Sequence, residues 1–110
     1  MSKAESSFVR IVKKDGFEIT KRGYPDFLVY RLVGNDIEYC FVEVKQSPDT
    51  TSRQQKDMLT IFLLAGLPIQ VIKDGSKIDY SLFKKFPQKD FMNLRKQVFR
   101  KSLLLGSLYR

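Results

Sequence analysis

The sequence predicts a single mixed α/β domain, in the order helix, three strands, helix, strand and basic helical tail. Two segments repeat apolar residues at helical spacing, two long apolar runs flank a Gly-Asn turn, and a shorter apolar run follows the second helix. A chain of 110 residues that is 43% hydrophobic normally forms one compact domain. We expect one domain over 1–110, with a core at about 3–73 and a basic helical tail at about 80–110.

The first helix is expected over residues 2–15, because Gly16 follows as a stop. Its apolar residues, which recur at helical spacing, are Ala4, Phe8, Ile11 and Val12. Residues 17–20 can form a short strand, and residues 21–25 are punctuated by Gly and Pro, which predicts a loop.

A β-hairpin is expected over residues 27–45. Residues 27–33 are β-branched and aromatic, Gly34-Asn35 is a turn signal, and residues 37–45 form a second apolar run. The second run is apolar on both faces until Glu43, so this strand should be central in the sheet.

The second helix is expected over residues 53–65, with Gly66 capping its end. Its predicted apolar stripe is Met58, Leu59, Phe62 and Leu63. Residues 68–73 predict a strand, residues 80–86 are ambiguous, and residues 89–105 predict an amphipathic helix. One face of that helix holds Phe91, Leu94, Val98 and Leu105, away from Lys96, Arg100 and Lys101.

The net charge of +8 is concentrated in the last third of the chain. Residues 1–72 hold ten basic and nine acidic side chains, whereas residues 73–110 hold ten basic and three acidic ones. Clustered Lys and Arg are typical of a nucleic-acid partner, and Lys96 and Arg100 are candidate phosphate contacts. A solvated helix face that keeps the protein soluble explains the same charges.

The absence of histidine excludes several kinds of catalytic site. A chain with no His and the single Cys40 cannot supply a Ser-His-Asp triad, an imidazole base, a thiolate metal cluster or an internal disulfide. Catalysis must use carboxylates, lysine, hydroxyls or a hard metal. We expect a soluble intracellular protein, in the cytoplasm or the host-cell cytoplasm if viral, because no signal peptide is visible and the longest apolar run, 61–67, cannot span a bilayer.

Two short motifs bring acidic and basic groups to one end of the predicted hairpin. Period-two alternation places Glu43 and Lys45 on one strand face, and a turn between residues 34 and 35 puts Asp26 opposite position 43. Taken separately, the first motif is explained by a strand-end ion pair and the second by turn chemistry. Taken together, two carboxylates and one ammonium favour a pocket for a hard divalent cation beside a phosphate.

The sequence resembles the PD-(D/E)xK nuclease superfamily, and within it the virus-type replication-repair nuclease (VRR-NUC) domain. The likeness covers roughly residues 4–72 and lies in Gly23-Tyr24-Pro25-Asp26, Glu43-Val44-Lys45 and Ser52-Arg53-Gln54-Gln55, with Gly66 eleven residues after Gln55. It implies a restriction-endonuclease-like core, a mixed sheet flanked by helices, with the basic helix added at the C-terminus.

The resemblance also implies roles for individual residues. Asp26 and Glu43 would bind Mg²⁺ or Mn²⁺, helped by the carbonyl of Val44, and Lys45 would orient or activate the attacking water. Glu5 and Gln55 match the family's first-helix acid and second-helix glutamine. Both also fit capping boxes, which would explain them without chemistry. Phosphate contacts are predicted at Lys21, Arg22, Tyr24, Arg53 and Lys56, for which solvated surface is an equally good explanation.

The function expected from these features is metal-dependent cleavage of the DNA backbone. Free-standing members of the resembled family tend to be homodimers that cut branched DNA such as four-way (Holliday) junctions in repair and recombination, so we expect branched duplex as substrate. We expect no membrane partner and no small-molecule substrate. The alternatives left open are a non-catalytic or partner-activated nucleic-acid-binding module on the same scaffold, and a nuclease acting on RNA.

Overall fold

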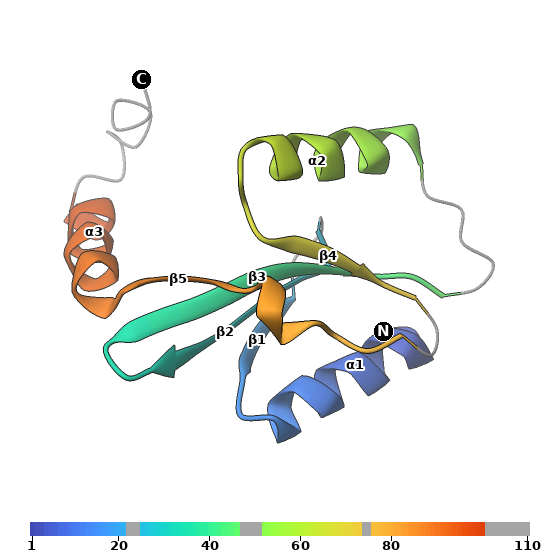
Figure 1. Ribbon diagram of the computed structural model, residues 1–110, viewed down its shortest axis with the longest axis horizontal. Helices are drawn as coiled ribbons and strands as arrows, with labels where there is room; N and C mark the ends of the chain where they lie inside the picture. Colours follow the sequence, from blue (N-terminus) through green and yellow to red (C-terminus); the bar gives the residue numbers. More distant parts are fainter. Residues whose placement is uncertain (22–24, 47–51, 74–75, 101–110) are drawn as a thin grey trace.

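Two helices cover opposite faces of a mixed sheet (Figure 1). The computed structural model describes residues 1–21, 25–46, 52–73 and 76–100, with the side chains of 98–100 outside the description. Helix α1 (Lys3–Lys14) lies on one face and α2 (Arg53–Leu64) on the other. Both helices begin with a Ser-capped capping box and are followed by a glycine at positive φ, Gly16 and Gly66, as the sequence predicts.

The sheet is built around one long strand. Its path is β1-β2-β3-β4, with β5 also paired to β3, and its strands are β1 (Glu18–Lys21), β2 (Phe27–Val33), β3 (Asp36–Val44), β4 (Ile69–Ile72) and β5 (Lys84–Pro87). The pair β3–β4 is parallel and the other pairs are antiparallel. Helix α2 is the crossover that the parallel pair requires. The predicted mixed α/β core flanked by helices is confirmed.

The hairpin register decides which residues meet at its open end. Val33 pairs with Asp36 beside the turn, and Phe27 pairs with Val42 six residues further out. Gly34 supplies the turn at a φ of +61°. Continuing the same register by one residue brings Asp26 level with Glu43, as the turn position predicts.

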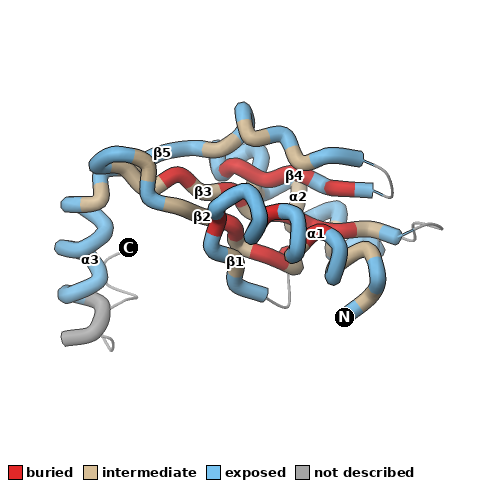
Figure 2. Tube along the Cα trace, turned by 90° about the horizontal axis from the view of Figure 1, so that it is seen from below, coloured by how far each residue is buried: buried red, intermediate tan, exposed pale blue. Residues whose placement is uncertain are grey.

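The hydrophobic core lies between the sheet and α1. Phe8 and Val12 of α1 pack against the face of β2 and β3 that carries Val29, Cys40 and Val42, and each of these three is 0% exposed. Figure 2 shows the buried positions gathered along these central strands. Burial raises the pKa of the Cys40 thiol to about 11, so this cysteine packs as a small apolar residue.

The opposite face of the sheet is only partly covered by α2. Phe62 packs on Phe41 of β3, with ring centroids 5.3 Å apart, and no residue of α2 is buried. Leu63 is 63% exposed, so its predicted place in the apolar stripe of this helix is wrong. The contact with the sheet is narrower than the stripe, and periodicity alone does not report how much of a stripe is covered.

The ambiguous segment after β4 resolves into a short 3₁₀ helix, η1 (Tyr80–Leu82), and strand β5. Strand β5 pairs with the first half of β3, so this part of the chain belongs to the sheet. Helix α3 (Gln88–Arg100) begins beside the hairpin turn, where the Gln88 amide donates to the carbonyl of Asn35 at 2.8 Å. Figure 2 shows α3 standing apart from the sheet, and nearly all of its described residues are exposed. None of the described helices is long and apolar enough to cross a membrane.

Candidate active site

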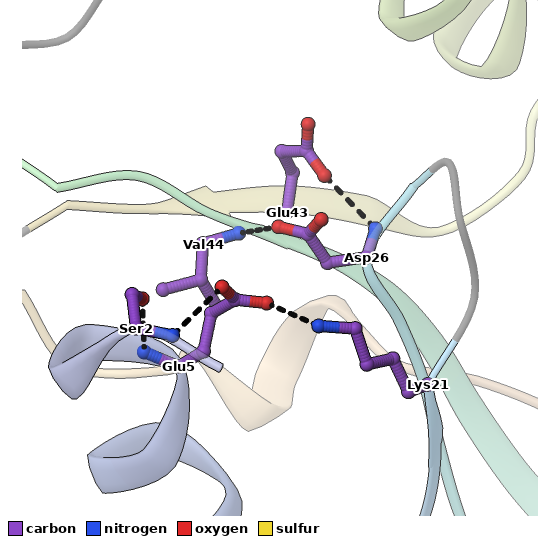
Figure 3. Close-up of polar contacts among 6 residues, drawn as sticks. All are labelled: Ser2, Glu5, Lys21, Asp26, Glu43 and Val44. Carbon is purple, nitrogen blue, oxygen red and sulfur yellow. Dashed lines mark hydrogen bonds and ion pairs between the residues drawn. The ribbon is translucent and has the colours of Figure 1, made fainter.

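The two predicted acids, Asp26 and Glu43, join the strands of the β2–β3 hairpin at its open end. The Asp26 amide donates to Glu43 Oε1 at 2.9 Å, and the Val44 amide donates to Asp26 Oδ2 at 3.0 Å (Figure 3). The side chains therefore make the cross-strand bonds that a backbone ladder would make if the strands continued. Pro25 is fully buried and fixes the chain just before Asp26. The carboxylates of Asp26 and Glu43 thus share one small volume at the ends of adjacent strands.

Glu43 is held in an environment that disfavours its charge. Only 2% of the residue is exposed, and this burial raises the pKa of its carboxyl above the ordinary value. The Asp26 carboxylate raises the pKa further, whereas the Asp26 amide and Lys45 act in the opposite direction. A buried acid beside a second acid is the arrangement expected where a cation binds.

Lys45 connects these acids to α2. Its ammonium lies 3.2 Å from Glu43 Oε2 and donates to Gln55 Oε1 at 2.8 Å. Gln55 also completes the capping box of α2. Its side-chain Oε1 accepts from the main-chain amide of Ser52 at 3.2 Å, and its main-chain amide donates to Ser52 Oγ at 3.1 Å. The Gln55 side chain therefore both caps α2 and contacts the candidate site through Lys45.

Glu5 lies on the α1 side of the strands, whereas Glu43 points toward the α2 side (Figure 3). Its Oε1 accepts from the Ser2 amide at 3.3 Å, and its Oε2 accepts from Lys21 Nζ at 3.0 Å. Burial acts to raise the pKa of Glu5, but the hydrogen bonds from Lys21 and Ser2 outweigh it and hold the pKa below its ordinary value. The structure therefore gives Glu5 a capping role and an ion pair, without a described bond to Asp26 or Glu43.

The predicted phosphate contacts fall into two groups. Lys21 lies at the end of β1, and the exposed pair Arg53 and Lys56 lies at the start of α2, the helix that contributes Gln55. Lys96 lies on α3, which begins at the opposite end of the hairpin, roughly 20 Å away at the rise of a β-strand. Arg22, Tyr24 and the side chain of Arg100 lie outside the described residues.

The donors at the hairpin end suit a hard divalent cation. Asp26 and Glu43 outnumber the single ammonium of Lys45, which leaves a negative excess in a buried position. In an extended strand the N–H and C=O of one residue point to the same side, so the carbonyl of Val44 faces the Asp26 side, as its amide does. The described residues contain no group of three or more His, Cys, Asp or Glu that could hold a metal ion. A cation here would rely on two carboxylates and would complete its shell with backbone, water and phosphate oxygens, as Mg²⁺ commonly does.

A comparison with protein-family profiles matches residues 2–74 to the VRR-NUC domain. The chain belongs to the VRR-NUC family. The matched region contains all of α1, the hairpin, α2 and β4, and it includes every residue that lines the hairpin end. The VRR-NUC domain is a nuclease of the PD-(D/E)xK type, a class that acts on DNA and typically uses divalent metals. Searches of curated proteins and of solved structures gave no significant match to this chain.

Sequence reasoning named Lys21 and Glu5 separately but missed the contact between them, and it missed two lysines that match no motif. The ion pair between Lys21 and Glu5 joins β1 to α1 next to the acids. Lys3 and Lys77 were not singled out, although they line a cavity that also reaches Lys45. Both lysines are far from Lys45 along the chain, so only the fold brings them to the same cavity.

Proposed function

We propose that this VRR-NUC protein is a metal-dependent DNA endonuclease, selective for branched duplex DNA and active as a homodimer. The observation that carries the proposal is the crossed pair of half-buried Asp26 and buried Glu43, which sets two carboxyl groups against one ammonium and is linked through Lys45 to Gln55. A purely structural hairpin end has no need for two carboxylates so close together, because placing like charges beside each other at a partly buried position costs free energy.

Each residue has a defined task in this proposal. A Mg²⁺ or Mn²⁺ ion held by Asp26, Glu43 and the carbonyl of Val44 would supply Lewis-acid activation of the scissile phosphate and of water. Lys45 donates hydrogen bonds that orient the attacking water and stabilise the charge that builds up on the phosphate oxygens. Gln55 holds the Lys45 ammonium in position through its Oε1.

The surrounding groups bind and position the substrate. Lys21, Arg53 and Lys56 contact phosphates on either side of the cut, together with Arg22 and Tyr24 from the loop before Asp26. Glu5 acts as a positioning residue, because it holds Lys21 at the end of β1. Lys96 and Arg100 contact DNA away from the cut, at the far end of the hairpin. The single cysteine fits a protein that works in a reducing intracellular compartment.

The direct test is a cleavage assay on a panel of labelled DNA structures, with Mg²⁺, Mn²⁺ and chelator in parallel. We expect the wild type to cut a four-way junction faster than a linear duplex of the same sequence, and only with metal. Asp26→Asn and Lys45→Met should abolish cutting. Asp36→Asn, which removes a carboxylate at the opposite end of β3, is the matched control and should cut normally. Equal cutting by all four proteins would refute the site.

The dimer is tested separately, because a four-way junction needs two symmetric cuts. Two sites in one particle can make both cuts before the DNA dissociates. Sedimentation velocity should give twice the chain mass of 12.9 kDa. Mixed dimers of wild type and Asp26→Asn should nick one strand and leave the other intact. If the protein sediments as a monomer and still cuts both strands of the junction at equal rates, the dimer is refuted.

A second candidate is a nucleic-acid-binding module without turnover of its own. The position of α3 favours it, because the basic helix lies far from the acids and can bind DNA whether or not cleavage occurs. A salt-sensitive gel shift on branched DNA, with no cleavage in Mn²⁺, would support this candidate against the nuclease.

A further inference from the structure

A cavity of about 600 Å³ lies beside the candidate active site, on the α1 side of the sheet. One wall is the α1 surface that carries Lys3, Ser7 and Ile11, and the other is formed by side chains of residues 76–80. The floor is apolar and includes Phe8, Val44, Ile72 and Ile78. Ile11 is 54% exposed, so an apolar side chain borders open space here. The volume suits about one or two nucleotides and excludes a duplex.

The rim of this cavity is strongly basic. Among the described residues, four lysines line it, Lys3, Lys45, Lys73 and Lys77, against one acid, Asp15. The hydroxyl of Tyr80 donates a hydrogen bond to the Asp15 carboxylate. The ammonium of Lys45 is bound to Glu43 and Gln55 at the acid site. Basic side chains around an apolar floor match the chemistry of single-stranded DNA, in which phosphates follow the rim and unstacked bases cover apolar and aromatic surface.

The wall formed by residues 76–80 is attached to the core of the protein through hydrogen bonds of Asp79 and the ring of Tyr80. Gln70 of β4 is buried, its Nε2 donates to the carbonyl of Asp79 at 2.9 Å, and its Oε1 accepts from the Asp79 amide at 2.8 Å. The next residue, Tyr80, stacks on Phe17 with ring centroids 4.9 Å apart and an interplanar angle of 3°. The cavity is therefore preformed, which lowers the entropic cost of ordering a ligand in it.

Lys45 belongs both to this cavity and to the acid site. It lines the cavity, and its ammonium pairs with Glu43 at 3.2 Å. Val44 has a similar double position, because its side chain lies in the cavity floor and its amide binds Asp26. The cavity and the acid site therefore share the end of β3.

We propose that this cavity binds an unpaired stretch of the DNA strand that is being cut. This inference rests on the proposed nuclease function, because the bound strand is taken to be the one that is cut. Strand binding itself can be measured without cleavage. It gives a physical basis for selecting branched DNA, because a strand leaving a branch point can unstack locally, whereas a continuous duplex offers no unpaired nucleotide without paying for base-pair opening.

The test is binding of a labelled oligothymidine and of a blunt duplex to the full chain, by fluorescence anisotropy in chelator over a range of salt. Ser7→Glu places a carboxylate in the cavity and should weaken single-strand binding about tenfold, because the carboxylate repels the phosphates. Lys77→Gln removes one phosphate contact and should lower the salt slope of single-strand binding by about 0.7. Lys13→Gln is the matched control, since Lys13 is on the same helix but does not line the cavity, and it should leave both quantities unchanged.

Thermal melting of each variant confirms folding before binding is compared. Unchanged single-strand affinity in folded Ser7→Glu, or an equal loss for oligothymidine and duplex, would overturn the proposal. The two proposals fail independently. Wild-type protein that binds the single strand through the cavity and never cuts would refute only the nuclease. A Ser7→Glu protein that binds the single strand as the wild type does, while the wild type cuts DNA, would refute only the cavity.

Discussion

The two faces of the central strand β3 differ in what they contribute. On the α1 face, Cys40 and Val42 are completely buried in an aliphatic core. On the α2 face, Phe41 contacts Phe62, the helix above has no buried residue, and Glu43 is a buried charge beside a second acid. Alternate residues of β3 therefore lie in different environments. If the proposed site is correct, the first set provides stability and the second provides chemistry, so mutations should separate the two.

The largest effect is expected from Glu43→Gln, which keeps the shape of the side chain and removes its charge. Cleavage should fall about 10³-fold or more, because a metal ligand and the charge that orients Lys45 are lost. In chelator at neutral pH, the same change should raise the free energy of unfolding by ~1 kcal/mol, since it removes a buried charge that Asp26 repels.

The pH dependence of this gain follows from the direction of the pKa shift. Burial, and then the Asp26 charge, raise the pKa of folded Glu43 above its ordinary value of 4.5. The wild type therefore loses stability relative to Glu43→Gln as pH rises from that value through the folded pKa. Below pH 4.5 the difference in free energy of unfolding between the two proteins should disappear. Urea unfolding of both proteins across this range measures it. A variant that is less stable than wild type at neutral pH would contradict the assignment of Glu43 as an unfavourable buried charge.

Divalent metal should stabilise the protein through the α2 face alone. At a concentration 100 times its dissociation constant, a bound ion adds about 2.7 kcal/mol, which appears as a rise in Tm. Asp26→Asn should lose most of this rise in Mg²⁺ and Mn²⁺, while Asp36→Asn at the other end of β3 keeps it. A Tm that rises equally in both variants would place the metal elsewhere.

Truncating apolar side chains should affect the two faces unequally. Val42→Ala opens space in the sealed core and should cost about 2 kcal/mol of unfolding free energy. Leu64→Ala should change it by less than ~0.5 kcal/mol, because Leu64 is 84% exposed. Denaturant unfolding measures both, and the cleavage rate per folded molecule should stay normal in Val42→Ala. Equal costs would mean that the α2 face is covered in solution, for example by a second copy of the chain.

The smallest effect concerns Glu5, on the α1 side. Its lowered pKa means that its ionised form stabilises the fold above pH 4.5 and that this contribution is lost as pH falls through the folded pKa. The partly exposed pair with Lys21 limits the effect to at most ~1 kcal/mol. Glu5→Gln keeps a capping side chain and should flatten the stability curve below pH 4.5. A cleavage loss as large as that of Glu43→Gln would instead give Glu5 a direct catalytic role.

Local chemistry explains why much of this structure could be predicted from sequence. The turn at Gly34 fixes the hairpin register, and the register alone sets Asp26 opposite Glu43. The helix ends follow from Ser caps and glycine stops. The pairing of β5 with β3 could not be predicted, since it joins residues about fifty positions apart and neither segment encodes its partner. The exposure of Leu63 depends on how closely α2 approaches the sheet, which the spacing of its own residues does not determine.

The crossed bonds between Asp26, Glu43 and Val44 have a consequence for how such proteins evolve. These carboxylates are the acceptors that close the hairpin, so replacing either by alanine leaves a main-chain amide without its acceptor. A descendant that stopped cutting DNA would still be under pressure to keep an acceptor oxygen at both positions, which Asn or Gln also supplies. Lys45 is the better indicator of a working enzyme, because the described bonds of its ammonium reach only other side chains of the site.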